Sequence, residues 1–326
     1  MMKYNLMIYL ILFISPLMIM SINNLYGMWI NMELNILMFL IYMINNNKNC
    51  YDYSMKYFLV NSFSSSIFII FLNLNMLNFM EFYLIIMNIM MYVKLGMFPF
   101  QFWFVDMMNN LNWISCFFLS TLQKLIPFYL LILMLNKFLF FLMILINGMI
   151  SILYVMDALN LKIIMSYSSI NHMCWMLITL MLNKILWFYY FMFYSLINMC
   201  LMYCFNKLLM IHYLDMYKNY FNFMKYIIMF LMFSLGGLPP FFGFIMKWYF
   251  MFNVIYMNNY VLLFLLVFYS LVYLYNYLRM IFVYNLNEFN SLKYLNLNFL
   301  NFINYNLIYF FFNFSLFGLF FYLILF

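Results

Sequence analysis

Four charged side chains lie deep within long apolar stretches of the sequence, where a charge is costly. They are one acid and three lysines: Glu33, Lys94, Lys124 and Lys247. A charge at the centre of a bilayer costs at least about 2.5 to 3.5 kcal/mol, so four idle charges would together cost on the order of 10 kcal/mol. A carboxylate that approaches or leaves a buried ammonium switches the lysine between holding and releasing its proton. These residue types therefore predict a proton relay inside a membrane.

The alternative for these four charges is static ion pairing that fixes how the helices align. For a single pair the two interpretations are evenly balanced, but three separated lysines and one acid cannot all be paired. His172, about a third of the way into another apolar stretch, is a further candidate because histidine carries protons near neutral pH. A single histidine in a membrane is more often an interhelical contact, so both roles stay open.

The composition defines the kind of structure that must hold these residues. The chain has 326 residues, of which 71% are hydrophobic and 6% charged, against roughly 45 to 50% and 25% in a soluble domain. This excludes a water-soluble globular protein. At about 30 residues per helical span and turn, the length accommodates about eleven transmembrane helices and no sizeable domain outside the membrane. The apolar runs are long and apolar on every side, which argues against a β-barrel. We therefore expect an all-α polytopic membrane protein.

Apolar runs bounded by polar or turn-forming clusters predict eleven helices. In chain order their ranges are 4–22, 25–44, 56–74, 78–106, 112–135, 136–156, 163–182, 185–206, 222–257, 260–284 and 305–326. The fourth and ninth are longer than one bilayer span, and each contains a glycine and proline cluster, at 96–99 and 236–240. Proline removes a backbone donor and clashes with the preceding turn, so both should be broken helices whose freed carbonyls face protein or water.

The two broken helices are five helices apart, which predicts two five-helix units, the second inverted because the repeat is odd. The predicted parts of this single transmembrane domain are 1–135, 136–284, and a loop with a C-terminal helix at 285–326. Inverted repeats with interrupted helices are the architecture of ion-coupled secondary transport, where the break lies at the functional site. Lys94 and Lys247 flank the two breaks, and Lys124 precedes Pro127. Chance placement of the prolines is the alternative.

The remaining basic residues, in loops or toward the ends of spans, are unevenly distributed between the two sides of the membrane. Nine fall on the side of the N-terminus: Lys3, Lys48, Lys56, Lys162, Lys207, Lys218, Lys225, Arg279 and Lys293. Two fall on the opposite side, Lys137 and Lys184. The positive-inside rule then places the N-terminus inside and, after an odd number of spans, the C-terminus outside. The net charge of +7 needs no nucleic-acid partner.

Amino-acid usage indicates where the chain is made. Met (38), Phe (45) and Tyr (32) are abundant, whereas Ala158 and Arg279 are the only residues of their kinds. This bias is typical of an AT-rich genome in which ATA is read as Met, as in animal mitochondria. Residues 1–12 contain no Arg-rich transit sequence and are followed by no small-residue cleavage site. We expect a protein of the mitochondrial inner membrane with its N-terminus in the matrix and its C-terminus in the intermembrane space.

No motif in the chain predicts a bound cofactor or metal. The five cysteines, Cys50, Cys116, Cys174, Cys200 and Cys204, form neither a disulfide framework nor a Cys-x-x-Cys pair. Cys200 and Cys204 share a helix face, which in an apolar run indicates lipid or core contact rather than a metal site. A glycine-rich nucleotide loop is also absent from the sequence.

The motifs around the lysines resemble a known family. They are Tyr92-Val93-Lys94-Leu95-Gly96 continuing through Pro99-Phe100-Gln101-Phe102-Trp103, Gln123-Lys124-Leu125-Ile126-Pro127, Tyr167-Ser168-Ser169-Ile170-Asn171-His172-Met173, and Leu235-Gly236-Gly237-Leu238-Pro239-Pro240 through Lys247-Trp248. They are similar to the mitochondrial NADH-ubiquinone oxidoreductase chain 2 family, of animal and specifically insect type. Met32-Glu33-Leu34-Asn35 and Lys56-Tyr57-Phe58-Leu59 agree as well. The match runs in order over the second to ninth helices, whereas the last two match by length and hydrophobicity.

The resemblance implies a subunit of respiratory complex I in its antiporter-like, proton-pumping membrane arm. NADH oxidation and ubiquinone reduction, with flavin and iron-sulfur clusters, are then expected in other subunits, and the expected partners are neighbouring membrane-arm subunits and lipid. Members from bilaterian animals lack the first three of fourteen helices, in agreement with eleven here. In the family, the acid matched by Glu33 partners the broken-helix lysine matched by Lys94. Lys124 matches the central lysine and Lys247 the second broken-helix lysine.

The sequence departs from the family pattern at three positions. Gln101 stands where a histidine is usual, Val105 where a proline is usual, and Cys174 where a glycine is common. Because glutamine does not titrate, a proton role at position 101 is in doubt. The alternatives are a stand-alone cation/proton antiporter and a structural linker subunit without a proton path. A receptor or channel is disfavoured, since its ligand site would not require lysines at inverted-repeat positions.

Overall fold

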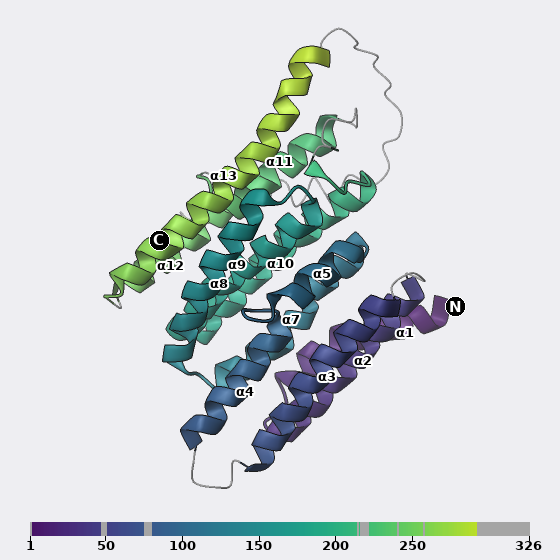
Figure 1. Cartoon of the computed structure of the whole chain (residues 1–326), viewed down its shortest axis with the longest axis vertical. Helices are drawn as coiled ribbons and strands as arrows, with labels where there is room; N and C mark the ends of the chain where they lie inside the picture. The colour runs from purple at the N-terminus through teal and green to yellow at the C-terminus, as the bar shows by residue number, and fades with distance from the viewer. Residues whose placement is uncertain are drawn as a thin grey trace. The chain divides into compact units, whose positions relative to one another are not determined.

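The structure is a computed structural model that describes residues 2–46, 51–74, 80–213, 215, 222–239, 241–256 and 258–291. Within these ranges the chain is built from helices (Figure 1), and the only extended pairing is an isolated bridge between Asn160 and His212. The predicted all-α membrane class is confirmed. Seven helical stretches of the described chain are long and apolar enough to cross a membrane, and three shorter apolar helices accompany them. The predicted helix 305–326 lies outside the described residues, so the number eleven stays a prediction.

The helices follow the predicted apolar runs closely. They are α1 (Met2–Ile19), α2 (Leu25–Asn46), α3 (Tyr51–Leu74), α4 (Met80–Leu95), α5 (Gln101–Asn110), α6 (Trp113–Ser120), α7 (Leu122–Leu133), α8 (Lys137–Asp157), α9 (Leu161–Leu182), α10 (Lys184–Lys207), α11 (Asn222–Gly236), α12 (Phe242–Tyr256) and α13 (Tyr260–Ser291). Hydrophobic length in the sequence therefore sets the element boundaries, because each helix must bury its backbone polar groups within its own hydrogen bonds.

Both predicted helix breaks are present. The fourth predicted helix divides into α4 and α5, and the ninth into α11 and α12. Each break begins with a glycine in the left-handed conformation, Gly96 with φ +70° and Gly237 with φ +81°. At each break the following N–H donates back five residues, from Met97 to the Tyr92 carbonyl at 3.0 Å and from Leu238 to the Phe233 carbonyl at 3.2 Å. These are helix-terminating bonds for which glycine is preferred. Pro240 lies outside the described residues.

A further interruption divides the fifth predicted helix, 112–135, which was expected to be continuous. The structure ends α6 at Ser120 and begins α7 at Leu122, with Thr121 at φ −122° and ψ −79°. The hydroxyls of Ser120 and Thr121 both donate to the carbonyl of Phe117, at 3.1 and 2.7 Å. Such side-chain bonds compete with the backbone for the same acceptor and bend helices.

The chain divides into two compact units, with the boundary between Asn147 and Gly148 inside α8. In unit 1, α7 is the central helix and packs against α1, α2, α4 and α6. In unit 2, α9 packs against α10, α12 and α13 and is buried over nearly its whole length. The predicted repeat boundary at 135 lies twelve residues earlier, and the inverted repeat itself stays a prediction. Lys124 and His172 are thus carried by the most enclosed helix of each unit.

Segments that carry basic residues assigned to one side of the membrane lie together at one end of unit 2. The N–H of Leu161 donates to the carbonyl of Ile211 at 2.9 Å, which joins the start of α9 to the segment after α10. The guanidinium of Arg279 donates to the carbonyl of Met156 at 2.9 Å, next to the end of α8. This arrangement agrees with the grouping of Lys162, Lys207 and Arg279 on one side.

One lysine counted on the N-terminal side of the membrane lies inside the structure. Lys225 belongs to α11 and is only 4% exposed. The positive-inside count therefore includes a buried residue: the predicted start of this helix at 222 agrees with α11, but one sequence does not reveal which neighbours cover the lysine. Lys48, Lys218 and Lys293 lie outside the described residues.

Candidate functional site

Glu33 and Lys94 form an ion pair in unit 1. Glu33 projects from α2, and Lys94 lies in the last turn of α4, where the carbonyl end of a helix favours a cation. The Nζ of Lys94 is 3.8 Å from Oε1 of Glu33, with the side chains 2% and 25% exposed. That separation is too long for a direct hydrogen bond, and neither atom has a hydrogen-bond partner among the described residues. The contact is therefore an ion pair without a direct hydrogen bond.

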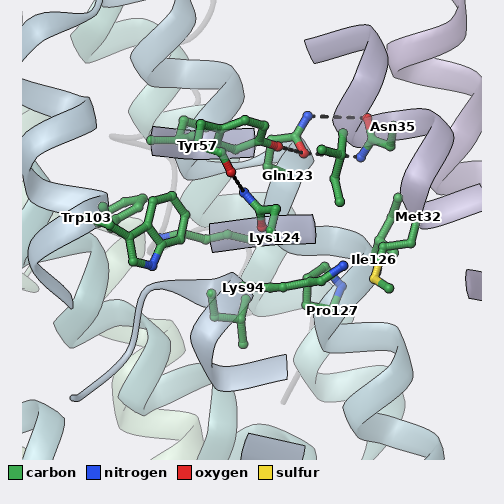
Figure 2. Close-up of a pocket in the computed structure, with 14 residues that line it drawn as sticks. Met32, Asn35, Tyr57, Lys94, Trp103, Gln123, Lys124, Ile126 and Pro127 are labelled. Atoms are coloured by element: carbon green, nitrogen blue, oxygen red, sulfur yellow. Dashed lines mark hydrogen bonds between the residues drawn. The ribbon is translucent and has the colours of Figure 1, made fainter. Parts of the chain in front are cut away.

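A cavity of about 20 Å³ adjoins this pair. Its polar lining is formed by six side chains: Asn35, Tyr57, Asn61, Lys94, Gln123 and Lys124. Figure 2 shows most of them converging from different helices around one space. This volume is large enough for one water molecule, and the lining offers more than the two to four polar partners that a buried water needs. The structure therefore brings Lys94 and Lys124 to one polar cavity, although they lie on different helices.

A cluster of hydrogen bonds between neutral side chains fixes the wall of this cavity beside Lys124. The amides of Asn35 and Gln123 bond reciprocally, with N···O distances of 3.4 and 3.3 Å. The phenol of Tyr57 donates to Oε1 of Gln123 at 3.0 Å (Figure 2). These bonds join α2, α3 and α7, so they hold the helix that carries Lys124 in register with the helix that carries Glu33.

Lys124 is enclosed in the core of unit 1. Its side chain is 2% exposed, and its Nζ lies 4.6 Å from the ring centroid of Phe104. An ammonium at this distance over an aromatic face is attracted by the ring quadrupole. Phe104 belongs to α5, so the second half of the broken helix contacts the central lysine.

Lys247 is seated on the other helix break, in unit 2. It lies on α12, is 5% exposed, and donates from Nζ to the carbonyls of Leu235 at 2.8 Å and Gly236 at 3.0 Å. These are the last two residues of α11, whose carbonyls lose their helical partners at the break. The negative end of the helix dipole adds to the attraction. The break therefore supplies the oxygen ligands for a buried ammonium without a carboxylate.

His172 makes the interhelical contact expected of a buried histidine. It lies on α9, is 5% exposed, and its Nδ1 is 2.8 Å from the hydroxyl of Tyr190 on α10. The ring of Tyr194 lies 4.9 Å away, centroid to centroid. A phenol both donates and accepts hydrogen bonds, so the contact is compatible with either imidazole tautomer.

Several predicted residues lie away from these contacts. Gln101 is 1% exposed on α5 but does not line the cavity. The cysteines of the described chain are buried and form no disulfide with one another: Cys116, Cys174, Cys200 and Cys204. Cys50 lies outside the described residues. Within the described ranges, no three His, Cys, Asp or Glu side chains gather as a metal site would require.

From the sequence, no role was assigned to the neutral residues that position the charged ones, although three of them lie within the quoted motifs. These are Asn35, Tyr57, Phe104, Gln123 and Tyr190. An amide within an apolar run is a usable signal, since it needs a partner when it is buried. Phe104 has no such signal, because it is one of 45 phenylalanines.

The fold and these sites define an antiporter-like membrane protein. Residues 22–273 match a family described as NADH:quinone oxidoreductase/Mrp antiporter, transmembrane region. A similar fold occurs in the membrane-bound sulfane sulfur reductase, an archaeal respiratory membrane complex, with a TM-score of 0.80 over 96% of this chain and 72% of that one, at 15% identity. Respiratory complex I from Thermus thermophilus gives a TM-score of 0.69 at 18% identity over 78% of this chain. That match spans 64% of the complex I chain, just under two thirds.

The sequence relatives are more specific than the fold. NADH-ubiquinone oxidoreductase chain 2 of Aedes aegypti is 36% identical over 297 residues, which are 87% of this chain and 86% of the relative. The chain belongs to the NADH:quinone oxidoreductase/Mrp antiporter family and, within it, to the NADH-ubiquinone oxidoreductase chain 2 proteins. The resemblance predicted from the lysine motifs is confirmed.

Proposed function

We propose that this chain is a proton-translocating membrane subunit of respiratory complex I, and that Glu33, Lys94, Lys124 and Lys247 carry its protons. It is a subunit of NADH:ubiquinone oxidoreductase, its partners are the other subunits of that complex, and it crosses the mitochondrial inner membrane several times. NADH, flavin, iron-sulfur clusters and ubiquinone belong to other subunits in this proposal. The N-terminus faces the matrix and the C-terminus the intermembrane space, as the distribution of basic residues predicts.

The observation that carries the proposal is the shared cavity. Glu33 contacts Lys94 at 3.8 Å, and Lys94 and Lys124 line the same small polar space. When Glu33 is near, its carboxylate stabilises the ammonium of Lys94. When Glu33 moves away, that ammonium becomes unstable in its buried site and releases its proton. Lys124 is the acceptor in this step, directly or through one water in the cavity.

Lys247 provides the corresponding step in unit 2. Its ammonium is held by the carbonyls of Leu235 and Gly236, which stabilise a cation without trapping it in an ion pair. A change in the geometry of the break would separate these groups and release the proton. His172, bonded to Tyr190, is a further candidate for proton transfer in this unit.

A stand-alone cation/proton antiporter is the second candidate function, because the matching family also includes the Mrp antiporters. It would use the same lysines but need no redox partner. The two functions differ in whether this chain purifies with the NADH-oxidising subunits, so identification of what co-migrates with it in a native membrane complex separates them.

The relay is tested by Lys124→Met in the assembled complex. Methionine keeps the length and apolar character of the lysine stem and removes the titratable ammonium, so the packing should survive. We expect proton uptake per NADH oxidised to fall by most of its value, while the amount of assembled complex changes little. Glu33→Gln and Lys247→Met should also lower the proton yield.

Lys184→Met is the matched control, since Lys184 begins α10 and has no role in the proposed relay. It should leave the proton yield unchanged. Normal pumping by all three relay variants in fully assembled complexes would overturn the relay and favour a structural linker. A register-fixing lysine would instead reduce assembly, because its removal strands a buried partner charge.

A further inference from the structure

Phe104 connects the first helix break to the central lysine. Its ring lies beneath the ammonium of Lys124, with 4.6 Å from Nζ to the centroid. Its Cβ occupies the space beside Gly96, where an added Cβ would lie only 2.5 Å from Cβ of Phe104. Phe104 is 1% exposed and also lines the cavity shared by Lys94 and Lys124. One aromatic side chain therefore contacts both the break and the lysine.

The contact with the ring favours the protonated form of the lysine. The aromatic face attracts the ammonium through its quadrupole and has no comparable attraction for the neutral amine. In a desolvated site, this preference amounts to about a 30-fold change in the equilibrium between the two forms. The attraction between the ring of Phe104 and the ammonium of Lys124 weakens when the ring tilts or moves aside, because it depends on the ring face pointing at the cation.

We propose that Phe104 is a positioning residue for the proton step at Lys124, and that its contact with Gly96 makes this step depend on the geometry of the break. The inference rests on the proposed relay. Lys94 lies two residues before Gly96 on the same helix end, so movement of its ion pair also moves the backbone against which Phe104 packs. The protonation state of Lys94 thereby affects Lys124 through the side chain of Phe104, in addition to any proton transferred between the two lysines.

Other charged and titratable groups near Lys124 also influence its protonation. Across the cavity lie Lys94 of α4 and Tyr57 of α3, and Glu33 of α2 contacts Lys94. Within the described residues, α1, α5 and α6 contribute no titratable side chain to the cavity lining. Substitution of Phe104 by another apolar residue removes the ring and leaves all of these groups in place.

The test is the pH profile of proton pumping by the assembled complex carrying Phe104→Leu. Leucine keeps an apolar side chain and removes the aromatic face. At high pH the relay stops when Lys124 is no longer reprotonated. Loss of the ring makes this happen at a lower pH, so the alkaline limb of the pumping profile should move about 1 to 1.5 pH units toward acid. This is the shift that about a 30-fold change in the protonation equilibrium of Lys124 requires. Phe104→Tyr keeps the ring and should restore the limb to near its wild-type position.

Phe68→Leu is the matched control for loss of a buried aromatic side chain. Phe68 is 0% exposed on α3 and does not line the cavity, so its variant should lower stability without moving the limb. Superimposable profiles for Phe104→Leu and Phe68→Leu would overturn the inference. If Lys124→Met abolishes pumping at the same time, the relay stands and only the role of Phe104 is lost. Normal pumping by Lys124→Met would instead overturn the relay itself.

Discussion

Substitution of Gly237 by alanine tests whether the bonds from Lys247 to the carbonyls of Leu235 and Gly236 matter to proton pumping. Gly237 has φ +81°, and a Cβ there would lie 3.0 Å from Cδ and 3.2 Å from Nζ of Lys247. Both distances are shorter than ordinary contacts, so the lysine must shift. The ammonium holds the carbonyls of Leu235 and Gly236 at 2.8 and 3.0 Å, and a shift of a few tenths of an ångström loosens at least one of these bonds.

The magnitude follows from two contributions. A left-handed conformation costs an L-residue about 1 to 2 kcal/mol relative to glycine, and a hydrogen bond to a charged group contributes about 1.5 to 3 kcal/mol. The first cost destabilises the break whether or not the lysine is bonded to it, so only the second, about 1.5 to 3 kcal/mol, acts against the bonded lysine. Since about 1.4 kcal/mol is a factor of ten, the equilibrium should shift away from the bonded lysine by roughly tenfold or more. We expect a large loss of proton uptake per NADH oxidised.

Gly236→Ala is the control at the adjacent position. A Cβ on Gly236 would meet its nearest atoms at 3.4 Å or more, an ordinary contact, and its backbone is helical. Alanine keeps the backbone carbonyl of Gly236 that accepts from Lys247 at 3.0 Å, so both bonds to the lysine remain and this variant should pump normally. The assay is proton uptake by reconstituted complex, normalised to assembled complex on a native gel. If Gly237→Ala and Gly236→Ala give the same proton yield, the bonds from Lys247 to the two carbonyls have no part in pumping, and the expected loss is refuted.

Two further predictions concern topology and the histidine contact. Impermeant labelling of sealed inner-membrane vesicles should modify Lys162 and Lys184 from opposite sides, and equal labelling from one side would contradict the predicted arrangement of spans. Tyr190→Phe removes the hydroxyl 2.8 Å from His172 and should cost about 1 kcal/mol, detected as earlier thermal inactivation of the complex. Inactivation at the wild-type temperature would show that this bond contributes nothing.

The fold was largely predictable because its determinants are local. Helix ends follow apolar length, and both breaks follow from glycine and proline within runs too long for one span. The interruption at Thr121 was not predictable, since serine and threonine occur in continuous helices and only the bonds to Phe117 show that they bend this one. The burial of Lys225 was missed for a related reason: the helix that covers it is chosen by packing, which one sequence does not reveal.

The site was predictable only in its charged members. A lysine in an apolar run stands out because its cost must be offset, whereas the residues that orient it are ordinary in such a composition. Asn35 and Gln123 are 88 positions apart, and nothing in the sequence pairs them. The contact between Phe104 and Lys124 depends on the path of the chain through the first break, so it exists only in three dimensions.

The two breaks use the same backbone device to hold a buried lysine in different ways. At the first, the chain leaves α4 through Gly96, and the nearby Lys94 is balanced by a carboxylate that is 25% exposed and therefore free to adjust. At the second, the chain leaves α11 through Gly237, and Lys247 is balanced by the carbonyls of Leu235 and Gly236, which cannot ionise. Loss of a proton at the first site leaves a carboxylate to be neutralised, whereas loss at the second leaves only neutral groups. The first site is therefore suited to respond to charge arriving from elsewhere, and the second to respond to a change in backbone geometry.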